Sequence, residues 1–85
     1  MDDRRKKLRF RAWRRGFREI DLILGPFADQ RIADLDEEGL LAFERLLDVP
    51  DQDAYEWITE ACPVPAEYDT PTLALIRAFR HELPH

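Results

Sequence analysis

Apolar residues spaced three and four positions apart dominate this chain and limit what it can fold into. Phe17, Ile20, Leu24 and Phe27 follow one another at intervals of three, four and three, which places them on one face of a helix. No segment shows the sustained alternation of apolar and polar residues, rich in β-branched side chains, that is typical of a half-buried strand. The sequence therefore predicts an all-α fold.

Capping residues, glycines and prolines predict where the helices begin and end. We expect five helices, at about residues 3–14, 17–31, 36–48, 53–60 and 71–82. Gly16 is expected to end the first helix as a C′ glycine, and Gly25-Pro26 to kink or end the second. Asp53 with Glu56 three residues later predicts a capping box for the fourth. Together these features predict a compact five-helix bundle, with residues 1–85 as a single small domain.

Most aromatic side chains are needed for the core of so small a bundle. Leu8 and Ala12 supply the apolar face of the first helix, and Phe10 and Trp13 are candidates to widen it. In a bundle of this size tryptophan is more often a core residue than a binding residue. Burial is therefore the expectation for Trp13 and for Trp57.

Size and residue chemistry both argue against an enzyme. Folding a chain of 85 residues uses most of its apolar side chains, which leaves little room for an internal active site. Cys62 is the single cysteine, and His81 and His85 near the C-terminal end are the only histidines. We therefore expect Cys62 to be a free thiol in a reducing compartment rather than a nucleophile. No spacing of cysteines and histidines resembles a zinc site, so no metal is expected.

Charge is divided unequally along the chain. Residues 1–20 hold nine Lys or Arg against three acids, and residues 21–85 hold four against fifteen. This asymmetry indicates docking onto a partner of complementary charge. A basic helix with Phe10 and Trp13 interleaved could also bind nucleic acid, but the net charge of −5 disfavours that alternative.

Cellular location can also be predicted from the composition. No apolar run approaches the roughly 18 residues of a membrane span, so no membrane insertion is expected. Eleven of the thirteen basic residues are arginine, which hints at a GC-rich bacterial genome. We expect a cytoplasmic bacterial protein, and a monomer by default.

The segment from Arg15 to Glu19 has two interpretations. If one helix spans both residues, they lie four apart on one face and form a surface ion pair. That interpretation leaves Gly16 unexplained, because glycine inside a helix costs about 1 kcal/mol relative to alanine. Gly16 either ends a helix in a left-handed conformation or lets another backbone approach closely. The second possibility describes a flat, polar-edged spot for a protein partner.

These residues resemble a known family. The chain looks like the small helical assembly factors that promote covalent flavin attachment to the flavoprotein subunit of succinate dehydrogenase. That family carries an Arg-Gly-x-x-Glu motif at the junction of its first two helices, present here as Arg15-Gly16-Phe17-Arg18-Glu19. The resemblance spans about residues 4 to 60. Further matching positions are Trp13-Arg14, Ile20-Asp21, Pro26-Phe27, the stretch from Phe43 to Leu47, Asp51, Asp53 and Trp57.

The resemblance implies a chaperone-like function rather than catalysis. Members bind the flavoprotein subunit of succinate dehydrogenase, some also that of fumarate reductase, and promote covalent attachment of FAD to it. Partner binding would fall to Arg15, Gly16 and Glu19, flanked by Arg11 and Asp21. No stably bound FAD is expected in the chain itself, because it has no glycine-rich dinucleotide loop after a strand. A small basic-faced helical regulatory module that binds nucleic acid or another protein stays open as the alternative.

Overall fold

The structure is a computed structural model that describes residues 2–83. His85 lies outside the described residues, as does Met1. The described part consists of helices and the loops between them, with no strand, so the predicted all-α fold with five α-helices is confirmed. Its elements are α1 (Asp3–Ala12), α2 (Arg18–Arg31), the short 3-10 helix η1 (Ile32–Asp34), α3 (Glu37–Asp48), α4 (Asp51–Ile58), a second 3-10 helix η2 (Ala66–Tyr68) and α5 (Pro71–Glu82).

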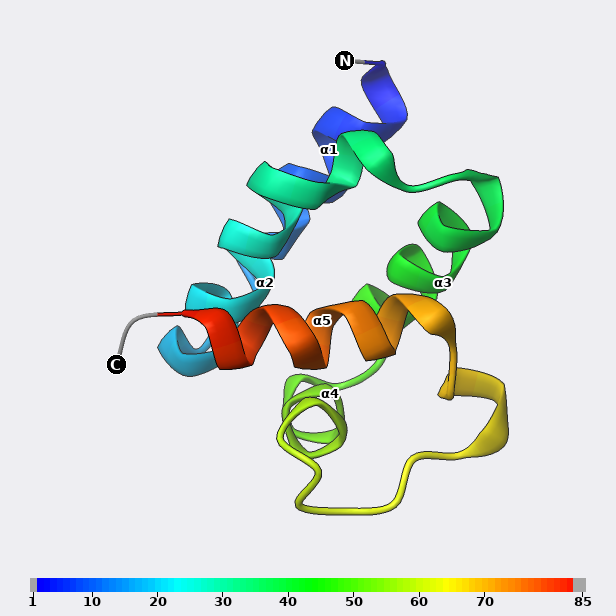
Figure 1. Ribbon diagram of the computed structural model, residues 1–85. Coiled ribbons are helices and arrows are strands. Elements are labelled where there is room, and N and C mark those ends of the chain that lie inside the picture. Colours follow the sequence, from blue (N-terminus) through cyan, green and yellow to red (C-terminus); the bar gives the residue numbers. More distant parts are fainter. Residues whose placement is uncertain (1, 84–85) are drawn as a thin grey trace.

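The helices pack as a small bundle in which α5 crosses the others. Figure 1 shows α1 and α2 side by side, with α5 (orange to red) running across α2 and α3. The shorter α4 packs against α3 and α5. A long connector, which contains η2, joins α4 to α5 along one edge of the molecule (Figure 1). The short loop from α1 to α2 lies close to the segment where α3 ends and α4 begins.

Three phenylalanines from three helices meet at the centre of the core. The ring of Phe27 on α2 lies 5.6 Å from that of Phe43 on α3 and 5.6 Å from that of Phe79 on α5. Aromatic pairs at such distances contribute about 0.5–1.5 kcal/mol each beyond the burial of their area. The helical spacing predicted that each phenylalanine lies on the apolar face of its own helix, but not that the three rings meet.

Three helices begin with a side-chain cap. The carboxylate of Asp2 accepts a hydrogen bond from the Arg5 backbone N–H, and Asp36 and Thr70 cap α3 and α5 in the same way. Each cap satisfies one of the backbone donors that the first turn leaves without a partner. The bonds from the Arg5 backbone and guanidinium also lower the pKa of Asp2 below its usual value.

Three helix boundaries differ from the prediction by two residues, one of them the end of the fourth helix at Ile58 rather than at residue 60. The first helix ends at Ala12 rather than at residue 14. The fourth begins at Asp51 rather than at residue 53, with Pro50 as its N-cap. Asp53 thus falls inside the first turn, where a carboxylate is favoured by the helix dipole, and the expected capping box with Glu56 is wrong. The Glu56 carboxylate instead accepts hydrogen bonds from Gln52 and Cys62.

The second helix continues through its proline. Of the two outcomes expected at Gly25-Pro26, an end of the helix does not occur, because α2 runs unbroken to Arg31, the end that was predicted for it; a kink there stays a prediction. Proline removes only one intrahelical bond, and the turns on both sides bury Leu24 and Phe27 completely. Burial of these flanking turns stabilises the helix more than the proline weakens it.

Two aromatic side chains expected in the core are exposed. Phe10 is 60% and Trp13 is 40% accessible to solvent. One face of the Trp13 indole packs flat on Gly25, where a Cβ atom would overlap the ring. Trp57 is half-buried against Tyr68, with ring centroids 4.9 Å apart. The expectation of burial is therefore wrong for Phe10 and Trp13, which face outward because Leu8 and Ala12 already fill the contact of α1 with the core.

Candidate protein-binding site

The loop between α1 and α2 turns at Gly16. Its φ angle of +108° is one that residues with a side chain rarely adopt. The C-cap of α1 is Trp13, so Arg14 occupies the C′ position and the prediction that Gly16 is the C′ glycine is wrong. Gly16 is exposed, and a Cβ atom added there would lie 3.1 Å from the Asp51 carboxylate. The glycine is thus required by backbone conformation and by a close neighbour.

The side chain of Arg15 fastens this loop to the end of α3. Its guanidinium donates to the carbonyl oxygens of Leu47 and of Val49, the latter at 2.7 Å. It also pairs with the Asp51 carboxylate at 2.8 Å, and only 9% of the Arg15 side chain is exposed. The last carbonyls of a helix lack intrahelical partners and carry partial negative charge. Arg15 satisfies two of these acceptors and thereby holds the loop in place.

Two further contacts complete what we call the Arg15 clamp, defined as Arg15, Phe17, Asp21 and Asp51. Asp21, in the first turn of α2, accepts a hydrogen bond from the Arg15 backbone N–H at 2.8 Å. The ring of Phe17 packs edge-on against that of Tyr55, with centroids 5.3 Å apart. Both ends of the loop are therefore tied to helices, α2 on one side and α4 on the other.

Glu19 and Arg18 lie on the solvent side of this fixed loop. Both side chains are exposed, and within residues 2–83 Glu19 makes no side-chain hydrogen bond or ion pair. The surface ion pair between Arg15 and Glu19 is not formed, because α2 begins at Arg18 and no single helix spans both residues. Gly16 and Glu19 are thus free to meet a partner, while Arg15 is occupied inside the chain.

The five residues predicted to bind a partner are therefore placed in two groups. Gly16 and Glu19 face solvent, whereas Arg15 and Asp21 position the loop and Arg11 pairs with Asp48 at 2.6 Å on the surface. Their role in partner binding stays a prediction. Sequence reasoning missed Asp51 as the partner of Arg15, although Asp51 was among the positions that carried the family resemblance.

Much of the charge asymmetry is balanced inside the molecule. Arg4, Arg5, Arg9, Arg11 and Arg15 each make a contact with a carboxylate of the same chain, at distances between 2.5 and 3.7 Å. Most of these pairs join α1 to a later helix, so the basic segment lies against acidic ones. This packing accounts for much of the basic run without any nucleic acid.

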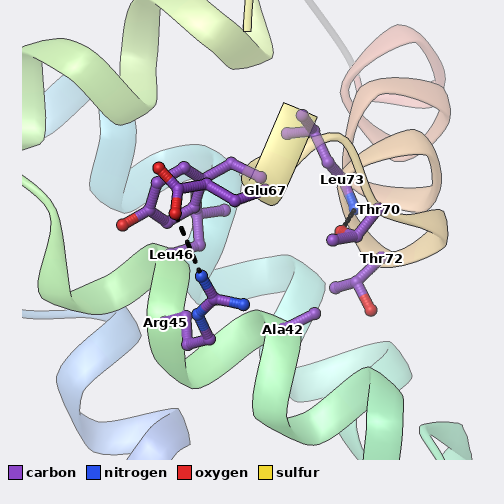
Figure 2. Close-up of a pocket in the computed structure, with 8 residues that line it drawn as sticks. Ala42, Arg45, Leu46, Glu67, Thr70, Thr72 and Leu73 are labelled. Carbon is purple, nitrogen blue, oxygen red and sulfur yellow. Dashed lines mark hydrogen bonds and ion pairs between the residues drawn. The ribbon is translucent and has the colours of Figure 1, made fainter. Parts of the chain in front are cut away.

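The pocket between α3 and η2 is too small for a cofactor. Figure 2 shows Arg45 reaching toward Glu67, with which it pairs at 3.8 Å, and Thr70 capping the start of α5 beside Leu73. The enclosed space measures about 10 Å³, close to the volume that one water molecule needs. Its residues therefore act as packing and capping groups.

Cys62 is held in its protonated form. Its Sγ donates to the Glu56 carboxylate at 2.7 Å, and that hydrogen bond together with burial raises the pKa of the thiol. The same bond, with a second from Gln52, lowers the pKa of Glu56. Since the thiolate is the nucleophilic form, this environment disfavours nucleophilic chemistry at Cys62.

Across residues 2–83, no three His, Cys, Asp or Glu side chains gather in a way that could hold a metal ion. No helix in this part of the chain has the length and hydropathy needed to cross a membrane.

Fold and loop together define a small helical protein whose distinctive feature is an exposed loop anchored by a nearly buried arginine. Comparison with known families shows where this class of protein belongs. Residues 6–80 match the sequence profile of the Sdh5 family, described as "Flavinator of succinate dehydrogenase". The match covers most of the chain, so the chain belongs to this family.

Relatives from eukaryotes and bacteria carry related names. The chain is 41% identical over 73 residues to "Succinate dehydrogenase assembly factor 2, mitochondrial" of Dictyostelium discoideum, which covers 86% of this chain and 52% of that protein. It is 36% identical over 70 residues to "FAD assembly factor SdhE" of Acetobacter pasteurianus, which covers 82% and 64% respectively. The chain thus spans between about half and two thirds of the length of these curated relatives.

Proposed function

We propose that this protein is an assembly factor that binds the flavoprotein subunit of succinate dehydrogenase and promotes covalent attachment of FAD to it. The observation that carries the proposal is the Arg-Gly-x-x-Glu motif, held rigidly on the surface of a chain that belongs to the Sdh5 family. The same surface could serve the flavoprotein of fumarate reductase. The chain itself is not the catalyst in this proposal, and it holds no FAD stably.

A helper without catalytic groups can still accelerate a covalent attachment. Joining a flavin to a side chain requires the reacting atoms, and the groups that stabilise developing charge, to be held in one geometry. A binding protein that prefers the conformation with this geometry raises its population in proportion to its preference. The assembly factor would therefore act by selecting a conformation of the flavoprotein, whose own groups carry out the reaction.

The residues of the motif divide this work between positioning and contact. Gly16 lacks a side chain and is exposed, so it allows the backbone of a partner to approach closely. Glu19 offers a carboxylate that the described part of the chain leaves unpaired, suited to a charged hydrogen bond with a donor on the partner. Arg15 acts indirectly, because its guanidinium already binds the carbonyl groups of Leu47 and Val49 and the carboxylate of Asp51.

The proposed setting follows the sequence predictions. We propose a monomer that works in the bacterial cytoplasm on a protein partner rather than on nucleic acid. The internal pairing of five arginines with carboxylates supports this choice, since those arginines have less attraction left for phosphates. One relative is named as mitochondrial and another comes from a bacterium. The bacterial origin of this chain stays a prediction.

The test measures covalent flavin on the partner. The flavoprotein subunit is co-expressed with the wild-type protein, with Glu19→Ala, with Glu38→Ala, or with neither. It is then denatured, and flavin fluorescence is read in its band on a gel. Glu38 is a matched control because it is also exposed and lies on α3, away from the loop. We expect strong signal with the wild type and with Glu38→Ala, and a loss of about tenfold or more with Glu19→Ala, as for a contact residue at the centre of an interface.

Two results would argue against the proposal. Equal flavin signal with and without the wild-type protein would mean that this flavoprotein does not depend on it. Equal loss with Glu19→Ala and Glu38→Ala would indicate a general effect of charge, and would remove the motif as the contact.

A further inference from the structure

Three exposed apolar side chains lie at the end of α1 and on α2, two helices that pack against each other. Phe10 and Trp13 end α1, and the Trp13 ring packs on Gly25 of α2. Leu22 precedes Gly25 by three residues, so it lies one turn away on the same helix face. We call Phe10, Trp13 and Leu22 the apolar strip. Within residues 2–83, the large apolar side chains that are 40% or more exposed are these three together with Leu41 and Leu75.

A basic hollow adjoins the strip. It has a volume of about 520 Å³, and it is lined by Lys6, Arg9, Phe10, Trp13, Arg14 and Asp29. Three of these side chains are cations and one is a carboxylate. Arg14 lies over the Phe10 ring at 4.4 Å, and Asp29 accepts from the Trp13 indole N–H at 3.3 Å. The hollow therefore combines an aromatic wall with an excess of positive charge.

The strip continues the surface of the Arg-Gly-x-x-Glu motif. Leu22 follows Glu19 by three residues on α2, so the two lie one turn apart on the helix surface. Trp13 and Arg14 stand at the beginning of the same loop that the Arg15 clamp holds rigid. A partner that covers Gly16 and Glu19 would meet the strip next.

We propose that the strip and hollow form a second part of the partner interface, which receives an apolar side chain flanked by carboxylates on the flavoprotein. This inference rests on the proposed function for the identity of the partner. Large apolar patches at exposed positions mark interaction sites, and tryptophan and arginine are the residues most enriched among energetically dominant contacts. The excess of cations around the hollow is complementary to carboxylates on the occupant.

A protein occupant fits these side chains better than a nucleic acid does. Base stacking needs open aromatic faces, but Gly25 covers one face of Trp13 and the Arg14 guanidinium covers one face of Phe10. The chain as a whole carries a net charge of −5, which opposes a polyanion further.

The chain offers matched controls for a test by mutation. Leu22, Leu41 and Leu75 are 48%, 49% and 50% exposed, so replacing each by serine removes a side chain of equal exposure. Affinity for the purified flavoprotein subunit is measured for Leu22→Ser, Leu41→Ser and Leu75→Ser, with circular dichroism to verify the fold. We expect Leu22→Ser to weaken binding by about tenfold and the two controls to stay within about twofold of wild type. Phe10→Ser, at the other end of the strip, is expected to weaken binding similarly.

Hydroxyl-radical footprinting checks the same surface without any substitution. Oxidation of Phe10, Trp13 and Leu22 is quantified by mass spectrometry with and without the flavoprotein subunit. The proposal expects protection of these three, while Leu41 and Leu75 remain as reactive as in the free protein. Protection of Leu41 or Leu75 in place of the strip would overturn it.

The outcomes separate this inference from the proposed function. Equal affinities for all three leucine variants, with Glu19→Ala still impaired in flavin attachment, would overturn the strip and leave the assembly function standing. Absence of binding by the wild type would overturn both.

Protection of Trp13 by a single-stranded oligonucleotide, lost on raising the salt concentration, would replace the protein occupant by a nucleic acid. Protection that appears on raising the concentration of the chain alone would replace it by a second copy.

Discussion

Within residues 2–83, the chain turns through a positive φ angle in two loops, and it stabilises the two turns by different means. In the loop from α1 to α2 the residue is Gly16, with a φ of +108°. In the connector from α4 to α5 it is Glu60, with a φ of +62°. A glycine adopts such angles without steric conflict, whereas a residue with a Cβ atom is strained there. The first loop thus avoids strain that the second one accepts.

The contacts around the two loops differ as well. A nearly buried arginine, Arg15, holds the first loop through two carbonyl groups and a carboxylate. The second loop is anchored from outside, by Arg77, whose guanidinium donates to the Trp57 carbonyl at 2.8 and 3.0 Å. Pro63 and Pro65 add stiffness to this connector because each proline has a fixed φ.

The difference in anchoring indicates which loop must keep its shape when a partner binds. A loop whose own buried side chain forms its anchor cannot move without leaving charged and polar groups unpaired. That degree of constraint suits a surface that presents Gly16 and Glu19 to a partner in one geometry. The connector carries no residue of the proposed interface, so it can accept strain at Glu60.

The largest effect is expected from removing the anchor of the first loop. Arg15→Ala leaves the Asp51 carboxylate and the carbonyls of Leu47 and Val49 without their donor. Breaking a buried ion pair by removing one partner costs about 3–5 kcal/mol. Because Asp51 is 26% exposed and can regain water, we expect a loss near the lower end, about 3 kcal/mol. Urea denaturation monitored by circular dichroism gives the free energy of unfolding.

The neighbouring arginine supplies the control for that measurement. Arg14 is exposed and its guanidinium lies over the Phe10 ring at 4.4 Å, so Arg14→Ala should lower the free energy of unfolding by less than about 1 kcal/mol. Arg15→Lys keeps the charge but loses the planar fork, and it should fall between the two. Equal stabilities for Arg14→Ala and Arg15→Ala would show that the clamp contributes nothing to stability.

The next largest effect concerns the glycine of the same loop. Gly16→Ala forces a residue with a side chain into a sparsely populated conformation, which costs about 1–3 kcal/mol. The added Cβ atom would also lie 3.1 Å from the Asp51 carboxylate and would displace the partner of Arg15. We expect a loss of about 2 kcal/mol in the free energy of unfolding, measured again in urea.

A double-mutant cycle separates the two causes of that loss. In an Asp51→Ala background the contact with the carboxylate is gone, and only the backbone strain remains. A smaller effect of Gly16→Ala in that background would measure the steric part. If Gly16→Ala leaves stability unchanged in both backgrounds, neither strain nor crowding limits this position.

The sequence predicted the helices well because each depends on local signals. Leu40, Phe43 and Leu47 lie on one face of α3, and Thr70 caps α5, since helical spacing and capping are properties of neighbouring residues. The errors occur where a distant residue intervenes. Trp13 was expected inside, yet its ring rests on Gly25 of another helix and stays exposed.

The candidate site shows the same limit more strongly. The sequence singled out residues 15 to 19 as unusual, and one of its two interpretations paired Arg15 with Glu19 because they are four apart. The actual partners of Arg15 are Leu47, Val49 and Asp51, which are more than thirty positions away. Such pairings depend on how α1 and α2 dock against the end of α3, and a single sequence carries no local signal for them.

The smallest effect is expected in the second loop, and with the opposite sign. The backbone N–H groups of Glu60 and Ala61 donate to the carbonyls of Trp57 and Glu56 at 3.3 and 2.8 Å, the pattern of a Schellman motif with Glu60 at C′. Glu60→Gly should therefore stabilise the fold by about 1 kcal/mol. Loss of the exposed pair between Glu60 and Arg77, at 3.7 Å, offsets at most about 0.5 kcal/mol of that gain.

Glu60→Ala removes the pair but keeps the strain, so the glycine variant should be more stable than the alanine variant in urea. If alanine is the more stable of the two, backbone strain at Glu60 is negligible and the proposed contrast between the two loops fails.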